Sequence, residues 1–468
     1  MNEAAFTALP TGKTMKPICV VICNFNKQDF VLGAIASVQE TATDIADILV
    51  VDNASTDQSV ALIRDQFPDI RLDVLPVNIG GSGGFAHGMR EAQQAGYRYV
   101  ALLDNDAVIL PGTLAGMMTC LESQSDIGVV GPAMCKMDTP EMVQEVGANV
   151  LSENGTFQLN YSSERYSAIS TELLECDYVP ACCLMTTGAV IAEVGVFDEQ
   201  FFLYWDDIDW CVRVKDAGWR VVADPQVCAL HKGGGVNATN TIPRYYLWRN
   251  KLRFFRKHPQ RYPASEICAA ITRDLARSVT FQRLNGMDEL LIALRQGLDD
   301  AEAGVWGRYQ GAAFPERGNG KRQLLNTMIP PGHYLMDFSA VLASGMSASR
   351  KLNSLCRFIT SCSQFSVMTH TFSVASSSLP PELMTRVLNW PAQVILADVR
   401  AGGMAKRLTV VPHLFDAGPL HPEADEVMTD LFWNLIPPTV SGLTSLTVAT
   451  EIDLLRHQVQ QFFAQENA

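Results

Sequence analysis

Two aspartates separated by one residue, Asp104 and Asp106, lie in the segment LLDNDAV. In an extended chain, side chains two residues apart point the same way, so these carboxylates can share one hard cation through their oxygens. A divalent cation there could bridge diphosphate oxygens and offset the charge that develops as a nucleotide leaves. For an isolated pair, a turn with a helix cap is the more common explanation.

A second acidic group, Asp206, Asp207 and Asp209, is packed among aromatic residues in the segment FFLYWDDIDWCVR. The dipole of a helix that begins there would stabilise one carboxylate, but it explains three poorly. Carboxylates crowded beside Trp205 and Trp210 can have raised pKa values, and such a group can act as a general base. The pattern therefore indicates a catalytic acid group.

A single histidine, His231, follows a predicted strand in the segment CALHKGGG. A lone histidine is more often structural than functional. Beside two carboxylates without another role, however, an imidazole commonly completes a divalent metal site, and the three glycines allow backbone to approach a ligand closely. His231 is thus a candidate third metal ligand.

The glycine-rich segment NIGGSGGFAHG at 78–88 allows a competing interpretation. Its GSGGFA run matches the dinucleotide-binding fingerprint, and Asp104 follows about twenty residues later, as in NAD-dependent oxidoreductases. Two βα units precede this segment, however, and hydride transfer has no evident use for Asp106 or the WDDID cluster. A P-loop is excluded because no GK[ST] follows.

These residues need elements that bring them to one edge of a sheet. Apolar runs bounded by polar or glycine-rich segments predict strands that alternate with amphipathic helices. This order of elements is typical of an α/β fold. Ligands of such sheets bind at the carboxyl ends of the strands. The expected strands are 17–23, 48–51, 71–76 and 98–103, and the expected helices are 29–40, 57–66 and 84–95.

The rest of the chain is expected to form further elements. Strands are predicted near 128–131, 187–192, 220–230, 393–399 and 408–411, with helices from 204 to 217 and from 244 to about 304. At 468 residues, two or three domains are expected. We predict an N-terminal tail (1–16), an α/β domain that carries these motifs (17–240), a helical, basic and aromatic extension (241–310) and a smaller C-terminal module (311–468).

Composition narrows the class of protein. A net charge of -14 and a pI near 5.1 argue against a general nucleic-acid binder, which needs clustered cations. No apolar run reaches the length of a membrane span, and the N-terminus lacks the pattern of a signal peptide, so we expect a cytoplasmic protein. The twelve cysteines form no CxxC pairs and are expected to be buried thiols.

The segment 244–261, RYYLWRNKLRFFRKHPQR, is basic and aromatic without one acidic residue. A helical surface of this kind can lie against anionic lipid, with Arg253, Arg256 and Lys257 as the contacts, which would place the protein on the cytoplasmic face of the inner membrane. The alternative is a helix whose aromatic residues face the core and whose cations are solvated. Sequence leaves both open.

Several ordered motifs together resemble the inverting nucleotide-sugar glycosyltransferases of family 2, which have the GT-A fold, and within them the galactofuranosyltransferase and rhamnosyltransferase branch. The resemblance covers about residues 17–258. It is carried by the motifs CNFNK (23–27), VVDNASTD (50–57), NIGGSGGF (78–85), LLDNDA (102–107), FFLYWDDIDW (201–210) and HKGGG (231–235).

The resemblance implies a role for each matched position. It makes Asp207 the catalytic base and Asp104, Asp106 and His231 the ligands of Mn²⁺ or Mg²⁺. It places Asp206, Asp209 and Trp205 at the acceptor, where the two acids could also orient the base. It assigns the nucleotide-sugar pocket to Asn24, Asp52, Asn78, Gly80, Gly81 and Asn105.

The tryptophan before the acid pair favours UDP-galactofuranose as donor over dTDP-rhamnose, while Asn105 stands where close relatives often have a third acid. The implied acceptor is a cell-surface glycan or a lipid-linked glycan, such as O-antigen or capsule polysaccharide. A glycoside hydrolase, which also uses paired carboxylates, and an inactive sugar-binding module are further alternatives. The acceptor linkage and the oligomeric state stay open. The central expectation is spatial, namely that residues 104, 106, 207 and 231 converge on one cleft.

Overall fold

A computed structural model describes most of the N-terminal two thirds of the chain and selected elements beyond it. The chain divides into two compact units: residues 1–271, 292–314 and 459–468 form the first, and 272–291 with 315–458 form the second. Neither unit begins or ends at the predicted boundaries of 240 and 310. The described residues are 15–233, 241–284, 287–315, 332–343, 351, 355, 370–375, 394–397, 406–411, 426–430, 435–436 and 442–464.

The first unit is built on a sheet whose N-terminal half is parallel. Strands β1 (Ile18–Asn24), β2 (Ala46–Asp52), β3 (Arg71–Val74) and β4 (Tyr99–Asp104) follow the sequence prediction closely. Strand β1 pairs in parallel with β2 on one side and with β4 on the other. The strand order therefore reverses at β1, and the crevice outside the carboxyl ends of β1 and β4 is where such sheets bind ligands.

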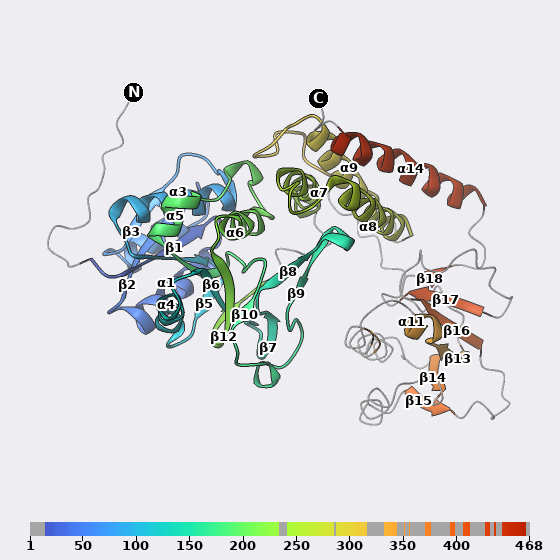
Figure 1. The fold of residues 1–468 in the computed structure, drawn as a ribbon, viewed down its shortest axis with the longest axis horizontal. Coiled ribbons are helices and arrows are strands. Elements are labelled where there is room, and N and C mark those ends of the chain that lie inside the picture. Colours follow the sequence, from blue (N-terminus) through green and yellow to red (C-terminus); the bar gives the residue numbers. More distant parts are fainter. Residues whose placement is uncertain are drawn as a thin grey trace. The chain divides into compact units, whose positions relative to one another are not determined.

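Helices cover both faces of the sheet (Figure 1), with α1 (Gln28–Ala42) and α4 (Thr113–Ser123) on one face and α3 (Gly80–Ala95) on the other; α1 and α3 contact the parallel half, and α4 packs on β6, β11 and β12. The short helix α2 (Ser59–Gln66) connects β2 to β3. The strands are buried on both faces, which explains their continuous apolar runs. The α/β fold class predicted from the sequence is confirmed.

The glycine-rich segment is helical almost throughout, which corrects the prediction of a loop before a helix at 84. Helix α3 begins at Gly80. A Cβ atom on Gly84 would lie 2.3 Å from Cys23 Sγ, and one on Gly88 would lie 2.1 Å from a Val21 methyl group. The glycines therefore let the helix lie directly on β1, and this close approach outweighs their low helix propensity.

The other half of the sheet is mixed. Strand β11 (Cys183–Thr187) runs antiparallel to both β4 and β6 (Ile127–Lys136), and β6 pairs in parallel with β12 (Arg220–His231). The strand predicted at 187–192 is wrong: after β11 the chain forms helix α5 (Gly188–Val194), with the Thr187 side chain as its N-cap. Strands β5 (Ala107–Ile109), β7 (Thr139–Glu145) and β10 (Leu174–Glu175) also belong to this half, whereas β8 (Ala148–Leu151) and β9 (Thr156–Leu159) form a separate two-stranded sheet.

Strand β12 contains a bulge before it reaches His231. Asp224 pairs with Pro132, and the next pair joins Cys228 to Ala133, so residues 225–227 have no counterpart on β6. Beyond the bulge, β12 also pairs with β5, and His231 stands opposite Ala107. The bulge thus sets which residues of the last part of β12 face the carboxyl edge of the sheet.

Helices follow the sheet. Helix α6 (Asp206–Asp216) precedes β12, and α7 (Thr241–Lys257), α8 (Ala264–Leu284) and α9 (Asp288–Glu302) form the predicted helical stretch. Helix α14 (Gly442–Ala464) lies near the end of the chain. Among the helices in the described parts of the chain, none combines the length and the apolar character that a bilayer span requires.

The second unit contains a separate sheet with the strand order β15-β14-β13-β16-β17-β18. The first five strands in this order pair in parallel, and β18 is antiparallel at the edge. The strands at 394–397 and 406–411 agree with the two predicted there. The strands are β13 (Gly332–Asp337), β14 (His370–Ala375), β15 (Val394–Ala397), β16 (Lys406–Val411), β17 (Glu426–Asp430) and β18 (Leu435–Ile436), with the short helix α11 (Ser339–Ala343) after β13.

Candidate active site

The two aspartates of the DxD motif lie at the end of β4 and in the turn to β5, facing the end of β12. His231 Nε2 lies 3.2 Å from Asp106 Oδ1 and 3.7 Å from Asp104 Oδ2. One ligand atom from each of these three residues lies within 4.8 Å of the others. The pairing of β5 with β12 brings the three side chains together, although the histidine is 125 positions from Asp106 in the numbering.

The surroundings of the cluster shift the pKa values of its two aspartates in opposite directions. Burial raises the pKa of Asp104 to about 6, which the nearby His231 partly offsets. Burial also acts on Asp106, but hydrogen bonds from His231 and from Lys27, whose Nζ lies 3.0 Å from Asp106 Oδ2, keep the pKa of this carboxyl below its usual value. Two carboxylates this close favour a bound cation.

The chemistry of this donor set fits a divalent metal ion. Carboxylate oxygens suit Mg²⁺ and Mn²⁺, and imidazole nitrogen is a common additional ligand of first-row metals. His231 Nδ1 lies 3.2 Å from Gln144 Nε2, so the second ring nitrogen has a partner that orients the ring and leaves Nε2 directed at the aspartates. The residues that could hold a metal are therefore Asp104, Asp106 and His231.

The first two acids of helix α6 form a second carboxylate group. Asp206 is only 8% exposed, and Asp207 is half-buried. Burial, together with the neighbouring Asp206, raises the pKa of Asp207 to about 8, and burial raises that of Asp206 as well. In the described part of the chain neither carboxylate forms an ion pair that would lower its pKa. Asp207 therefore holds a proton more tightly than an ordinary carboxyl and can exchange it near neutral pH.

One short segment connects the two carboxylate groups. The backbone N–H of Ala181 donates to Asp207 Oδ2 at 3.3 Å, and the N–H of Asp104 donates to the carbonyl of Cys182 at 3.0 Å. Consecutive residues of the segment that leads into β11 thus hold the candidate base and the first candidate metal ligand. Asp104, Asp106 and His231 thus form one cluster, and Asp207 is connected to Asp104 through this segment. Of these four residues, Asp104 lines the pocket described below.

A further acid, Glu145 at the end of β7, was missed by the sequence analysis. It is 6% exposed, and its Oε2 has no hydrogen-bond partner in the described residues. Burial raises the pKa of Glu145 to about 7, and its charge influences both His231 and Asp207. No spacing motif marks this residue, so only the fold could reveal it.

Two residues predicted at the acceptor are enclosed instead. The Asp209 side chain is completely buried and contacts Arg213, Lys257 and His258 at 2.9–3.0 Å. Trp205 is 3% exposed, and its indole N–H donates to the carbonyl of Leu247 at 3.1 Å. Neither side chain offers surface to an acceptor in this arrangement; they anchor the start of α6 to α7.

An arginine–asparagine pair on α7 fixes the backbone that precedes the acid pair. Asn250 Nδ2 donates to the carbonyls of Phe201 (2.8 Å), Leu203 (2.7 Å) and Tyr204 (3.0 Å). Arg249, which is fully buried, donates to the carbonyl of Phe201 at 3.1 Å. The backbone here needs such support, because three non-glycine residues have positive φ angles, namely Phe202 (65°), Tyr204 (65°) and Trp205 (69°).

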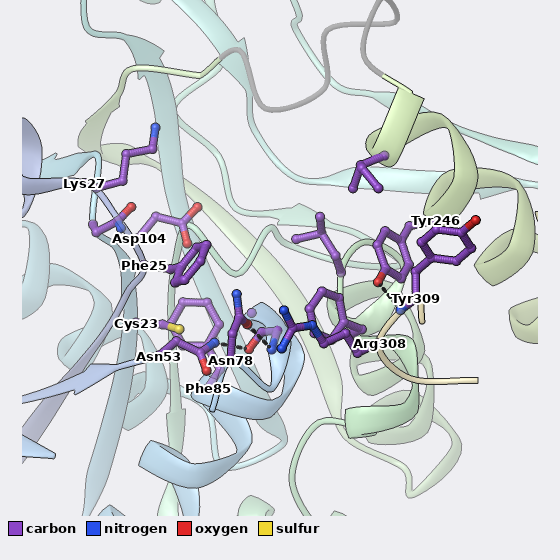
Figure 2. Close-up of a pocket in the computed structure, with 16 residues that line it drawn as sticks. Cys23, Phe25, Lys27, Asn53, Asn78, Phe85, Asp104, Tyr246, Arg308 and Tyr309 are labelled. Atoms are coloured by element: carbon purple, nitrogen blue, oxygen red, sulfur yellow. Dashed lines mark hydrogen bonds between the residues drawn. The ribbon is translucent and has the colours of Figure 1, made fainter. Parts of the chain in front are cut away.

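A pocket of about 510 Å³ opens beside the DxD motif (Figure 2), a volume within the range of small-molecule sites. We call it the β4 pocket. Five of the predicted site residues line it: Asn78, Gly80, Gly81, Asp104 and Asn105. Its other walls include Cys23, Phe25, Lys27, Asn53, Phe85, Phe202, Leu203, Ile242, Tyr246, Arg308 and Tyr309.

Two predicted nucleotide-binding residues lie behind this wall. Asp52 is fully buried and accepts hydrogen bonds from Asn24 Nδ2 (2.8 Å) and from the N–H of Ser55 (2.9 Å). Asn24 Oδ1 in turn accepts from Asn105 Nδ2 at 3.0 Å. Asn24 and Asp52 therefore connect the ends of β1 and β2 to Asn105, which reaches the pocket. Asn53, which lines it, was not predicted.

The basic and aromatic segment is not a free surface. Its aromatic residues at 245, 246, 248, 254 and 255 are buried. Arg253 pairs with Asp198 at 2.9 Å, Lys257 pairs with Asp198 and Asp209, and Arg256 lies 4.3 Å from the centre of the Phe462 ring. The aromatic residues face the core, as in the second interpretation of this segment, and the cations bind internal acids and rings. These contacts favour the second interpretation of the segment, and the lipid contact stays a prediction.

Residues 19–187 match the family model described as Glycosyl transferase family 2. The match begins in β1, passes through the glycine-rich helix and the DxD motif, and ends with β11. The chain therefore contains a glycosyl transferase family 2 domain, as the sequence motifs predicted. Helix α6, His231 and α7 lie beyond the matched residues.

Individual relatives agree with this assignment at low identity. The chain is 24% identical over 212 residues to the O-antigen biosynthesis protein RfbC of Myxococcus xanthus, covering 43% of this chain and 16% of that protein. It is 22% identical to an N-acetylglucosaminyl-diphospho-decaprenol L-rhamnosyltransferase of Mycobacterium tuberculosis, and 24% identical to the galactofuranosyltransferase GlfT1 of Mycolicibacterium smegmatis. These matches cover 39% and 43% of this chain, and 66% of the length of each relative.

A solved structure of GalNAc-T7 with UDP, GalNAc and Mn²⁺ aligns with a TM-score of 0.40 at 13% identity, covering 53% of this chain and 51% of that one.

Proposed function

We propose that this protein is an inverting, metal-dependent glycosyltransferase that transfers a sugar from a nucleoside diphosphate to a hydroxyl group of a glycan or lipid-linked glycan. The observation that carries the proposal is the arrangement at the edge of the sheet. A two-carboxylate, one-imidazole cluster lies beside the β4 pocket, and a carboxyl with a raised pKa is held by the adjacent segment at 181–182.

In this mechanism Asp207 accepts the proton of the acceptor hydroxyl. The hydroxyl oxygen forms a bond to the anomeric carbon as the bond from that carbon to the diphosphate breaks, and the nucleoside diphosphate leaves with the electron pair. A single displacement inverts the anomeric configuration. When bound, Mn²⁺ or Mg²⁺ at Asp104, Asp106 and His231 would stabilise the negative charge of the departing group.

The donor that we propose is UDP-galactofuranose. The tryptophan before the acid pair supports it, and one relative is named as a galactofuranosyltransferase. dTDP-rhamnose is the second candidate, since another relative is named as a rhamnosyltransferase. An O-antigen or a similar cell-surface polysaccharide is the proposed acceptor, which is supported by the name of the Myxococcus relative.

The dehydrogenase alternative loses its main support. Its fingerprint requires a glycine-rich turn between a strand and a helix, but β3 ends at Val74 and the glycines of GSGGFA lie within α3. A glycoside hydrolase would need two carboxylates facing each other across a sugar. It would have no use for the metal-ligand cluster.

Nucleotide binding tests the proposal directly. We expect UDP with Mn²⁺ to raise the thermal unfolding midpoint more than dTDP or GDP does, because a ligand that binds only the native state stabilises it. EDTA should remove this shift and stop transfer. If none of the three nucleotides with Mn²⁺ changes the midpoint, the protein is not a transferase of this kind; a larger shift with dTDP would identify rhamnose as the donor sugar.

A further inference from the structure

One wall of the β4 pocket comes from residues far outside the family-matched region. Ile242 and Tyr246 belong to α7, and Arg308 and Tyr309 follow α9. Figure 2 shows Asp104 and Lys27 at one end of the pocket and Arg308 and Tyr309 at the other. A ligand that fills the pocket would therefore contact both the DxD motif and this later segment.

The backbone around Arg308 is tied in place on both sides. The N–H of Gly307 donates to the carbonyl of Gln200 at 2.7 Å, and the Gly307 carbonyl accepts from Arg249 Nη1 at 2.7 Å. On the other side, the N–H of Tyr309 donates to Tyr246 Oη at 2.8 Å. The segment is thus positioned by the same arginine that supports the loop before Asp206.

The ring of Tyr309 is packed as firmly as its backbone. It stacks on Phe314 with ring centroids 4.7 Å apart, and it lies 4.7 Å from the ring of Tyr245. Tyr246 stacks on Phe202, another residue of the pocket wall, with centroids 5.1 Å apart. These contacts make the wall a preformed surface.

The Arg308 side chain is the exception in this packed segment. Within the described part of the chain it has no ion pair or hydrogen bond, although it lines the pocket. The other cation that lines the pocket, Lys27, is paired with Asp106. Arg308 is therefore the uncompensated cation of the pocket wall, and an anionic ligand group would be attracted to it.

We propose that Arg308 binds the diphosphate of the nucleotide-sugar donor, from the side of the pocket opposite the DxD motif. This inference rests on the proposed function. A pocket of 510 Å³ that includes Asp104, Asn105 and Asn78 accommodates one ligand of this size, and the diphosphate is the anionic part of that ligand. A guanidinium can donate two parallel hydrogen bonds to phosphate oxygens, a geometry that lysine cannot reproduce.

The test compares a nucleotide with its nucleoside. UDP and uridine are titrated, with Mn²⁺ present, into the wild-type protein and into Arg308→Gln, Arg308→Lys and the control Arg64→Gln, which changes an exposed arginine on α2. We expect Arg308→Gln to weaken UDP binding about tenfold to a hundredfold, since hydrogen bonds to charged groups contribute this much. Uridine binding should stay unchanged, Arg308→Lys should recover part of the loss, and the control should behave as wild type.

Steady-state kinetics add a second readout. In Arg308→Gln the KM for the donor should rise, while the KM for the acceptor should stay within about twofold of the wild-type value. Equal UDP binding by wild type and Arg308→Gln would overturn the inference and leave the proposed function intact. An equal loss of uridine binding, or a change in the acceptor KM alone, would assign Arg308 to another group and also overturn it. A wild-type protein that binds neither UDP nor dTDP would instead reject the proposed function itself.

Discussion

The first turn of helix α6 contains two carboxyl groups, Asp207 and Asp209, whose pKa values are shifted in opposite directions. Among the described residues Asp207 forms no ion pair, and its pKa is raised to about 8. Asp209, in contrast, contacts three cationic or titratable partners, and His258, Arg213 and Lys257 lower its pKa to about 2 despite its burial. The two residues are separated by Ile208 alone and share the same helix dipole.

The difference shows that burial by itself does not assign a function to an acid. Burial disfavours the charged form of both residues, and the partners decide the outcome. Where cations surround the carboxylate, it is a structural group that joins α6 to α7. Where they are absent, the carboxylate can take and release a proton in the neutral range, which is the property that a general base requires.

The strongest test of this comparison is the substitution Asp207→Asn. Removing the proposed base should lower kcat by about 10²- to 10⁴-fold, the usual contribution of general acid–base catalysis. UDP binding and the unfolding midpoint at pH 5 should change little, because Asn keeps the shape of the side chain. The measurement is a transfer assay together with a UDP titration; full activity in this variant would reject the assignment.

The matching substitution on the other side, Asp209→Asn, should act on stability rather than on chemistry. It leaves the buried His258 without its nearest carboxylate and Lys257 with Asp198 alone, and breaking such a group costs about 3–5 kcal/mol. Chemical denaturation would measure the loss. The control Asp126→Asn, at an exposed acid that contacts Arg220, should cost well under about 1 kcal/mol. Equal losses in both variants would remove the distinction.

The role of the loop that precedes α6 can be tested at Asn250. Asn250→Ala would leave the carbonyls of Phe201, Leu203 and Tyr204 without their shared donor, and each unsatisfied buried group costs about 1–3 kcal/mol. We expect a loss of about 2–3 kcal/mol in stability and a fall in kcat larger than the change in KM, because the start of α6 would shift. Asn149→Ala, which removes a single 3.3 Å bond to Asn160, serves as the control. Unchanged kcat in a folded Asn250→Ala protein would show that the hydrogen bonds from Asn250 do not position Asp207.

The last expected effect is a pH dependence of stability. With its pKa raised to about 8, Asp207 keeps a proton in the folded state over a range in which the unfolded chain, with an ordinary pKa of 3.8, has lost it. The folded state therefore loses stability as pH rises from about 4 to 8. Metal-free Asp207→Asn should match wild type near pH 4 and become the more stable protein by pH 8, as followed by thermal unfolding. A constant difference across this range would mean that Asp207 titrates normally.

Much of the fold could be predicted because its signals are local. The apolar runs of β1, β2 and β4 and the polar residues that follow them mark a parallel sheet and its ligand-binding edge. Glycine content misled the prediction at α3, because glycine usually breaks helices, and only the contact with Cys23 and Val21 explains why glycine is needed there. The strand expected at 187–192 failed for a similar reason, since short apolar runs do not distinguish a strand from a helix.

The candidate site was predictable only where side chains follow a spacing rule. Asp104 and Asp106 are such a pair, and the ordered motifs added His231 and Asp207. Glu145, Asn250 and Arg308 carry no pattern of their own, because their importance arises from what the fold packs against them. For the same reason, the sequence could not show that Asp209 is paired with Arg213, Lys257 and His258.

The bulge in β12 has a consequence for how insertions and deletions would affect this chain. Successive strand residues point to opposite faces, so the three unpaired residues at 225–227 determine whether the imidazole at 231 turns toward the aspartates or away from them. A deletion that moved β12 by one residue along β6 would reverse that orientation without altering any residue at the carboxyl edge. The length of a segment with no chemistry of its own therefore bears on where the candidate metal ligand points.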